Sequence, residues 1–229
     1  MKKIYTHVAV AKTAEGFGIA LDGRPLRTPG GRPLAVVHEL LATAIAAEWA
    51  AQNEVILPET MPMTQLASTA LDRVVPNRQA IIDQLVNYGG TDLLCYRAAN
   101  PRDLTERQED VWQPLVDWVS VDLGAELVVT SGVVPIAQPE SSLAALRRII
   151  EAYDDFRLAA LQSAVAAMGS LILGLALTEG RIGADDAFRA SQLDETYQIE
   201  FWGEDEEARL RREGLRKDVA AAAHFLELC

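Results

Sequence analysis

The chain has 229 residues and a mass of 24.9 kDa, enough for one large domain or two small ones. Its composition, 49% hydrophobic and 24% charged residues, is typical of a globular protein and excludes a disordered tail protein and a collagen. The 33 acidic and 21 basic side chains give a net charge of −12, so we expect no nucleic-acid partner. Cys95 and Cys229 cannot form a disulfide framework or a Cys-rich zinc site, and a reducing compartment fits this composition.

The N-terminal residues have the pattern of a small antiparallel sheet. Apolar and polar residues alternate over 4–10 and again over 17–21. The dipeptide Asp22-Gly23 follows, and it is typical of a tight hairpin turn because both residues tolerate positive φ. A short third strand is expected next, and residues 34–37 are a candidate fourth strand.

Helical periodicity starts at His38 and continues to about Gln52. The extended segment 54–63 contains two prolines, and we take it as a domain boundary. The predicted fold class is therefore α+β, with a small β-rich domain and one helix over residues 1–60, followed by a helical domain over 61–229. Thr64 is expected to cap the next helix. Further helices are predicted over residues 77–88, 103–122, 140–152, 155–178, 184–202 and 205–227.

Residues 158–177 form an uncharged run that is long enough to span a membrane. The run is rich in Ala and contains Gly and Ser, and its flanks carry charges of both signs. We therefore predict a buried helix and no membrane insertion. Gly169 and Gly174 are expected to permit close packing of this helix against its neighbours.

Motifs that would indicate catalysis are missing. The sequence has no phosphate-binding Gly-rich loop, no pair of histidines at metal-ligand spacing and no G-x-S-x-G turn. We therefore expect no catalytic residues, no cofactor and no metal, and a protein that is not an enzyme. Trp49 lies on the apolar stripe of the first helix, where packing is the expected role.

The most unusual segment is 185–207, which holds nine acidic residues and one arginine. Glu195, Gln198 and Trp202 lie at i, i+3 and i+7, so a helix would align them on one face. An aromatic side chain beside polar groups is typical of a protein-binding surface. Two alternatives stay open: Trp202 is a core anchor, and the acids after Gly203 serve the N-terminus of the next helix.

The order of several motifs resembles the ATP-twelve family, the assembly chaperones of F-type ATP synthase. The matching segments are Tyr5-Thr-His-Val-Ala-Val10, Leu21-Asp-Gly-Arg-Pro-Leu-Arg-Thr-Pro29, Ala44-Ile-Ala-Ala-Glu-Trp-Ala-Ala-Gln52, Met61-Pro-Met-Thr-Gln-Leu-Ala-Ser-Thr-Ala-Leu-Asp72, Thr91-Asp-Leu-Leu-Cys-Tyr-Arg97, Arg107-Gln108 with Trp112 and Pro114, Met168-Gly-Ser-Leu171, Glu195-Thr-Tyr-Gln198 and Trp202-Gly203.

The resemblance implies a protein that binds the free alpha subunit of the F1 head and protects it until the beta subunit takes its place. It implies a functional carboxylate in the E-x-Y-Q segment, with Glu195 as the best match and Asp194 as an alternative. The expected partner-binding residues are thus Glu195, Gln198, Trp202 and Asp194. Eukaryotic members carry a mitochondrial leader, and because this chain begins at the strand we expect a bacterial cytoplasmic member and a monomer.

Two other functions remain as alternatives. One is a small-molecule hydrolase or transferase that uses the carboxylates of Glu195 and Asp205 as acid and base, which requires the two groups to meet in a pocket. The other is an interaction module for a different client protein.

Overall fold

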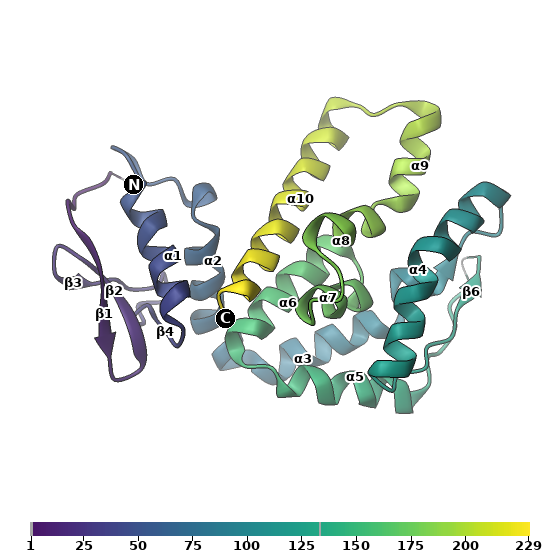
Figure 1. The fold of residues 1–229 in the computed structure, drawn as a ribbon, viewed down its shortest axis with the longest axis horizontal. Coiled ribbons are helices and arrows are strands. Elements are labelled where there is room, and N and C mark those ends of the chain that lie inside the picture. The colour runs from purple at the N-terminus through teal and green to yellow at the C-terminus, as the bar shows by residue number, and fades with distance from the viewer. Residues whose placement is uncertain (1, 133) are drawn as a thin grey trace. The chain divides into compact units, whose positions relative to one another are not determined.

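The computed structural model describes residues 2–132 and 134–229. The chain forms two compact units. The first, here the N-terminal unit, comprises Met1–Arg78, Asp154–Ala160 and His224–Cys229, and the second, the helical unit, comprises Gln79–Tyr153 and Leu161–Ala223. The predicted fold class is confirmed, since a small β-containing region precedes a larger helical part (Figure 1). The division at residue 60 stays a prediction.

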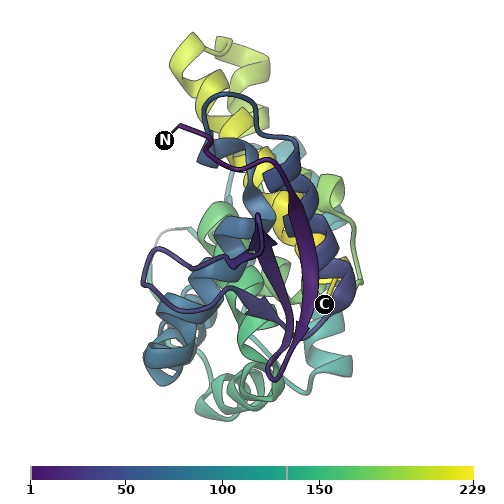
Figure 2. The ribbon, with the colours of Figure 1, turned by 90° about the vertical axis from the view of Figure 1, so that its left-hand side faces the viewer.

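The N-terminal unit contains a four-stranded antiparallel sheet (Figure 2). Strand β2 (Gly16–Leu21) is central, with β1 (Val8–Thr13) along one edge. Its other edge pairs with the two-residue strands β3 (Arg24–Pro25) and β4 (Ala35–Val36). Both short strands lie within segments that the sequence pattern indicated.

The predicted turn at Asp22-Gly23 is confirmed. Both residues have positive φ, 47° at Asp22 and 78° at Gly23, so the strands β2 and β3 reverse direction over two residues. The Asp22 carboxylate accepts hydrogen bonds from the backbone N–H groups of His7 at 2.7 Å and Thr6 at 3.1 Å. These bonds hold the pKa of Asp22 below its usual value.

Three helical segments complete the first part of this unit, and the start of one differs from the prediction. They are α1 (Glu39–Ala50), the 3₁₀ turn η1 (Pro58–Thr60) and α2 (Pro62–Thr69), which continues into a π-helical turn η2 (Ala70–Val74). The expected Thr64 cap is wrong, because α2 begins at Pro62. Glu48 from α1 instead accepts the N–H groups of Met63 at 2.7 Å and Thr64 at 2.8 Å.

The remaining helices lie wholly or largely in the helical unit. They are α3 (Val75–Gly90), η3 (Leu93–Cys95), α4 (Arg102–Asp122), α5 (Glu140–Ala152), α6 (Asp155–Met168), α7 (Leu171–Thr178), α8 (Ala184–Ser191), α9 (Leu193–Trp202) and α10 (Glu206–Glu227). A two-residue parallel pair, β5 (Tyr96–Arg97) and β6 (Thr130–Ser131), was not expected from the sequence.

The single helix predicted over 155–178 is wrong, because Gly169 separates α6 from α7 with a φ of 68°. The new helix start is stabilised by Asp92, which is completely buried. Its carboxylate accepts hydrogen bonds from the Ser170 hydroxyl at 2.8 Å, the Ile172 N–H at 3.0 Å and the Leu94 N–H at 3.1 Å. The break is therefore held by a polar group that is distant in the sequence.

Of the two glycines expected to permit close packing, Gly174 has that role and Gly169 does not, because no described atom lies within 4 Å of a Cβ built at Gly169. A Cβ atom at Gly174 would lie 2.5 Å from Cγ2 of Val165 and 3.0 Å from Cδ1 of Leu161, so a side chain there would overpack the α6–α7 contact. Every residue of α7 is buried. Across the described ranges, no helix has the length and apolar content needed to cross a membrane.

The helix predicted over 184–202 is also two helices. The backbone at Gln192 leaves the helical geometry, with φ −107° and ψ 19°, and this separates α8 from α9. Helix α8 is joined to α4 by the fully buried Trp112, whose indole N–H donates to the carbonyl of Ala190 at 2.9 Å.

Candidate partner-binding site

Helix α9 carries the predicted site residues, and it is positioned by contacts to α4. The Tyr197 hydroxyl donates to the Asp103 carboxylate at 2.9 Å, and Arg107 forms an ion pair with Glu200 at 2.9 Å. The Arg107 guanidinium also lies over the Tyr197 ring, 5.2 Å from its centroid. Burial and the neighbouring Asp103 carboxylate raise the pKa of Tyr197, which keeps its hydroxyl a donor.

Asp194 also lies on the side of α9 that contacts α4. Its carboxylate accepts a hydrogen bond of 2.6 Å from the side-chain amide of Gln108, which is 1% exposed. The other end of that amide, the Gln108 oxygen, accepts the N–H of Ala98 at 2.8 Å. Because both ends of the Gln108 amide are occupied, Asp194 completes a structural network that joins α9 to α4.

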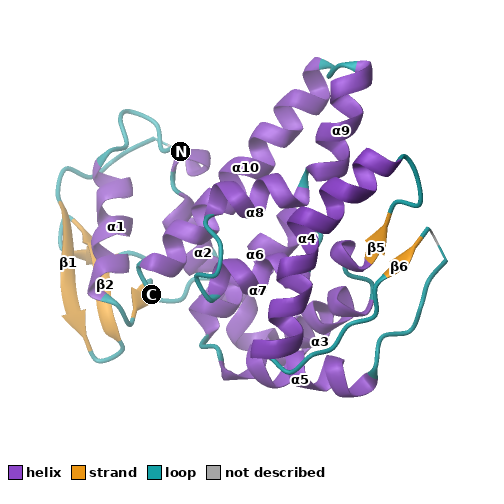
Figure 3. Cartoon of the chain, turned by 45° about the vertical axis from the view of Figure 1, so that its right-hand side comes forward, coloured by secondary structure: helices purple, strands orange, loops and turns teal. Residues whose placement is uncertain are grey.

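A second side of α9 faces α10, which runs beside it in the helical unit (Figure 3). Arg212 of α10 donates to the Thr196 hydroxyl at 3.0 Å and forms an ion pair with Glu204 at 3.1 Å. The helix is thus fixed on two sides, and the orientation of its remaining face follows from these contacts.

The remaining face of α9, here the outward face, presents Glu195, Gln198 and Trp202. All three are exposed, Trp202 to 80%, and Phe201 beside it is 62% exposed. Within the described residues, the side chains of Glu195 and Gln198 form no hydrogen bond or ion pair. The alternative of Trp202 as a core anchor is wrong. The outward face therefore combines a free carboxylate, a free amide and an exposed indole.

Of the four acids after Gly203, Asp205 and Glu206 act at the N-terminus of α10, in agreement with the second alternative, and Glu204 pairs with Arg212. Gly203 ends α9 with a φ of 76°. The Asp205 carboxylate accepts the N–H of Ala208 at 2.8 Å, and Glu206 forms an ion pair with Arg209 at 2.7 Å. Asp205 is thus a helix cap beyond the break, while Glu195 faces outward, so the two carboxylates that the hydrolase alternative requires do not come together within the described residues.

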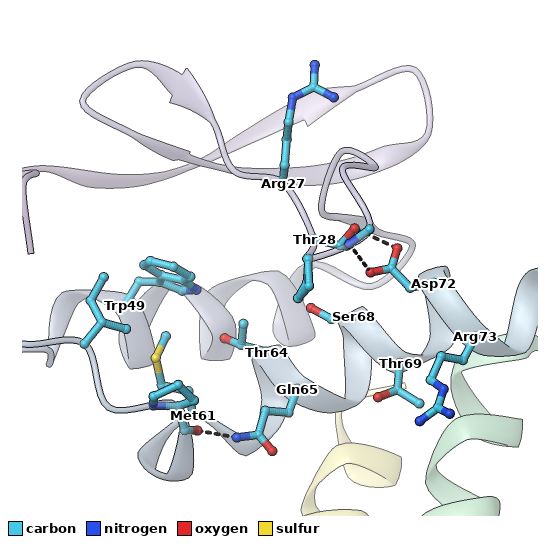
Figure 4. Close-up of a pocket in the computed structure, with 14 residues that line it drawn as sticks. Arg27, Thr28, Trp49, Met61, Thr64, Gln65, Ser68, Thr69, Asp72 and Arg73 are labelled. Atoms are coloured by element: carbon cyan, nitrogen blue, oxygen red, sulfur yellow. Dashed lines mark hydrogen bonds between the residues drawn. The ribbon is translucent and has the colours of Figure 1, made fainter. Parts of the chain in front are cut away.

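Sequence reasoning missed a cavity of about 790 Å³ in the N-terminal unit (Figure 4). Its lining comes from the loop that carries Arg27 and Thr28, from Trp49 on α1, and from Met61 and the exposed side of α2. We call it the Trp49 cavity. These segments are far apart in the sequence and share no local pattern that would predict a cavity. The one local hint is that Glu48, which caps α2, is followed directly by Trp49, which lines the cavity.

Comparison with known proteins defines the class, which is a chaperone. The family model described as ATP12 chaperone protein matches residues 2–120, more than half of the chain. The chain belongs to the ATP12 chaperone family. This confirms the resemblance, drawn from the sequence motifs, to ATP-twelve family chaperones of ATP synthase assembly.

Individual relatives agree over nearly the whole chain. The crystal structure of Atp12 from Paracoccus denitrificans matches with a TM-score of 0.96 and 43% identity, covering 99% of this chain and 97% of that one. The mitochondrial protein atp12 of Schizosaccharomyces pombe is 28% identical over 218 residues, 90% of this chain and 75% of that protein. The Saccharomyces cerevisiae protein ATP12 is 24% identical, covering 97% of this chain and 82% of that one.

Proposed function

We propose that this chaperone binds the free alpha subunit of the F1 head of ATP synthase and covers its assembly surface until the beta subunit replaces it. The observation that carries the proposal is the outward face of α9. It holds Glu195, Gln198 and Trp202 without partners in the described chain, on a helix whose other sides are fixed by hydrogen bonds and ion pairs. A rigid helix with an exposed indole between polar groups suits recognition of a protein surface.

The affinity that an assembly chaperone requires also supports the outward face of α9 as the binding surface. An unassembled subunit exposes an apolar surface that is otherwise covered, and such a surface promotes aggregation. A chaperone must cover it with moderate affinity, because the final subunit contact has to displace the chaperone. A small, partly polar face with one aromatic anchor meets that demand better than a large apolar groove would.

Charge favours a basic region of the client. Residues 185–207 carry nine acids and one arginine, and Glu195 on the outward face lacks a compensating cation among the described residues. Attraction between opposite charges accelerates encounter and disfavours unsuitable partners. Asp194, by contrast, faces α4 and accepts the hydrogen bond of Gln108, so we assign the functional carboxylate to Glu195.

We also infer how the protein acts, in which oligomeric state and where. The protein acts by binding and without catalysis, since Asp205 caps α10 and Glu195 points outward. It acts as a monomer with no nucleic-acid partner, in line with its net charge of −12. It acts in a bacterial cytoplasm, which the higher identity to the Paracoccus protein, 43% against 28% and 24% for the two fungal proteins, supports.

An aggregation assay tests the proposal. The isolated alpha subunit is warmed with equimolar chaperone, and light scattering is followed over time. Wild-type protein is expected to suppress the scattering, and Glu195→Lys and Trp202→Ala to suppress it much less. Glu15→Lys is the matched control, because it makes the same charge change at an exposed turn of the N-terminal unit.

Two outcomes of the aggregation assay would contradict parts of the proposal. Equal protection by wild type, Glu195→Lys and Trp202→Ala would overturn the assignment of the outward face. Failure of wild-type protein to protect the alpha subunit, with protection of another client, would instead favour a general interaction module.

A further inference from the structure

The Trp49 cavity contains a polar group that the fold does not satisfy. The indole N–H of Trp49 is inaccessible to solvent and has no hydrogen-bond partner within the described chain. The ring itself is well held, because it packs against Tyr5 and the Tyr5 hydroxyl donates to the carbonyl of Trp49 at 2.7 Å. A buried donor without an acceptor costs free energy, so such a group calls for a functional explanation.

The walls of the cavity are fixed in place by two carboxylates. Asp72 accepts the Thr28 hydroxyl and the Gly30 N–H, each at 2.7 Å, and this holds the loop above α2. A side chain at Gly30 would collide with Asp72, since its Cβ atom would lie 2.6 Å from Oδ1. On the other side Glu48 holds the N-terminus of α2. The cavity is therefore a preorganised feature of the N-terminal unit.

The chemistry of the lining favours a polypeptide. Ile56, Met61 and the ring of Trp49 provide an apolar surface. The hydroxyls of Ser68 and Thr69 are free of hydrogen bonds to other described residues, so they can serve a backbone N–H or C=O. Figure 4 shows the indole nitrogen of Trp49 on the side of the ring that faces α2. An apolar hollow with one fixed donor and adaptable hydroxyls is typical of a peptide-binding pocket.

The charges of the lining residues indicate which chemical groups the bound segment should carry. Arg27 and Arg73 are among the lining residues, but the Arg27 guanidinium points away from the cavity and donates to the Gly31 carbonyl at 2.7 Å, so the positive charge comes from Arg73 (Figure 4). Asp72, the one acid among the lining residues, accepts the hydrogen bonds of Thr28 and Gly30. Arg73 is exposed and forms no ion pair with any described residue. The N-terminal 36 residues also carry six basic and two acidic side chains, in contrast to the acidic chain as a whole. The occupant should therefore bring negative charge next to its apolar group.

We propose that the Trp49 cavity binds an extended segment of the client polypeptide. One large apolar side chain of the segment enters the cavity, a small displacement of the Trp49 ring lets a backbone carbonyl of the segment accept its indole N–H, and an adjacent acidic side chain meets Arg73. This rests on the proposed function for the identity of the client, and it adds a second contact in the N-terminal unit to the outward face of α9.

Nuclear magnetic resonance of the full chain tests the pocket directly. The chain has four tryptophans, so a ¹H–¹⁵N spectrum contains four indole signals, and Trp49→Phe identifies that of Trp49. The probe is the peptide N-acetyl-Glu-Leu-Phe-Leu-Glu-amide, added in a concentration series. We expect a saturable shift of the Trp49 indole signal, and a much weaker response to the same peptide with Lys in place of both Glu residues.

Variants separate the hydrogen bond from the shape of the cavity. Peptide affinity of the variants is measured by calorimetry, because Trp49→Phe removes the indole signal. Trp49→Phe keeps a ring and removes the unsatisfied donor, so it should leave the melting temperature unchanged and weaken peptide binding about fivefold, as expected for one hydrogen bond. Ser68→Trp fills the cavity and should weaken binding by more than about tenfold. Trp202→Phe, at an 80% exposed position, is the control that should bind normally.

Each outcome decides a separate point. No shift of the Trp49 signal, a parallel shift of all four indole signals, or a saturable shift caused by ATP in place of the peptide would overturn the inference. Because the wild-type titration requires no variant, a folding defect in Ser68→Trp does not affect this conclusion. Peptide binding without protection of the alpha subunit would overturn the proposed client, and protection without peptide binding would overturn the pocket alone.

Discussion

Asp92 and Glu195 both lie near the start of a helical segment in the helical unit, and they have opposite surroundings. Asp92 is completely buried, and its oxygens accept hydrogen bonds from Ser170, Ile172 and Leu94. Glu195 is exposed, with no hydrogen bond to the described residues. A carboxylate with several partners stabilises the fold, whereas one without partners is available for a client. Substitutions at the two sites should therefore affect different measurements.

Asp92→Ala should produce the largest loss of stability. The substitution leaves three buried donors without an acceptor, which we expect to lower the free energy of unfolding by about 4 kcal/mol. Chemical denaturation monitored by circular dichroism measures the change. Asp110→Ala, at an exposed position of α4, is the control and should remain near wild type. A loss below about 1 kcal/mol at Asp92 would contradict its structural role.

Asp92 should also make stability depend on pH. Burial raises the pKa of this carboxyl from 3.8 to about 6, against the opposing effect of its hydrogen bonds. The folded state then binds a proton more tightly than the unfolded state. Its contribution to stability is complete below about pH 4 and is lost as the pH rises to about 6, with a total of about 3 kcal/mol.

Comparison with Asp92→Asn isolates this titration, since Asn does not ionise. The difference in unfolding free energy between wild type and Asp92→Asn should move in favour of wild type as the pH falls from about 6 to about 4. A difference that stays constant over this range would show that Asp92 does not titrate there.

Tyr197→Phe tests the inward contact of α9 and should have a smaller effect. It removes the hydrogen bond to Asp103 and keeps the ring that packs on Phe201, so the expected loss is about 1 kcal/mol. Tyr88→Phe is the matched control, because its hydroxyl bonds to no other residue in the described ranges. Equal losses in the two variants would mean that the Asp103 contact adds nothing.

Glu195→Lys should have the smallest effect on stability and the largest effect on client binding. Without a partner to lose, the side chain can change charge with a shift below about 0.5 kcal/mol in unfolding free energy. Affinity for the isolated alpha subunit, measured by calorimetry, should fall about tenfold or more. If Glu195→Lys lowered the free energy of unfolding and left the affinity for the alpha subunit unchanged, Glu195 would have a structural role like that of Asp92.

Local sequence chemistry predicted the features that depend on neighbouring residues. The Asp22-Gly23 turn is one, and the spacing that places Glu195, Gln198 and Trp202 on one face is another. The break at Gly169 was not predictable in this way. The apolar run continues through it, and the group that holds the break, Asp92, lies 78 residues from Ser170 in the sequence.

The same limit applies to the sites. The sequence motif favoured Glu195 as the best match and left Asp194 as an alternative, and the distant Gln108 on α4 distinguishes them. The Trp49 cavity combines a loop, two helices and a connector, and its unsatisfied indole donor is a property of the tertiary structure alone. Predictions from local patterns were accurate for turns and faces, and they failed where one buried polar group selects the arrangement.

Photo-crosslinking shows whether the client contacts the outward face of α9. Benzoylphenylalanine replaces Trp202, which is 80% exposed, or in a control Val121, which is 82% exposed. Val121 lies 14 residues beyond Arg107 on α4, about 21 Å along the helix axis from the contact with α9. Irradiation with the isolated alpha subunit should yield a crosslink from position 202 and none from position 121. A crosslink from position 121 alone would mean that the client binds away from the outward face of α9.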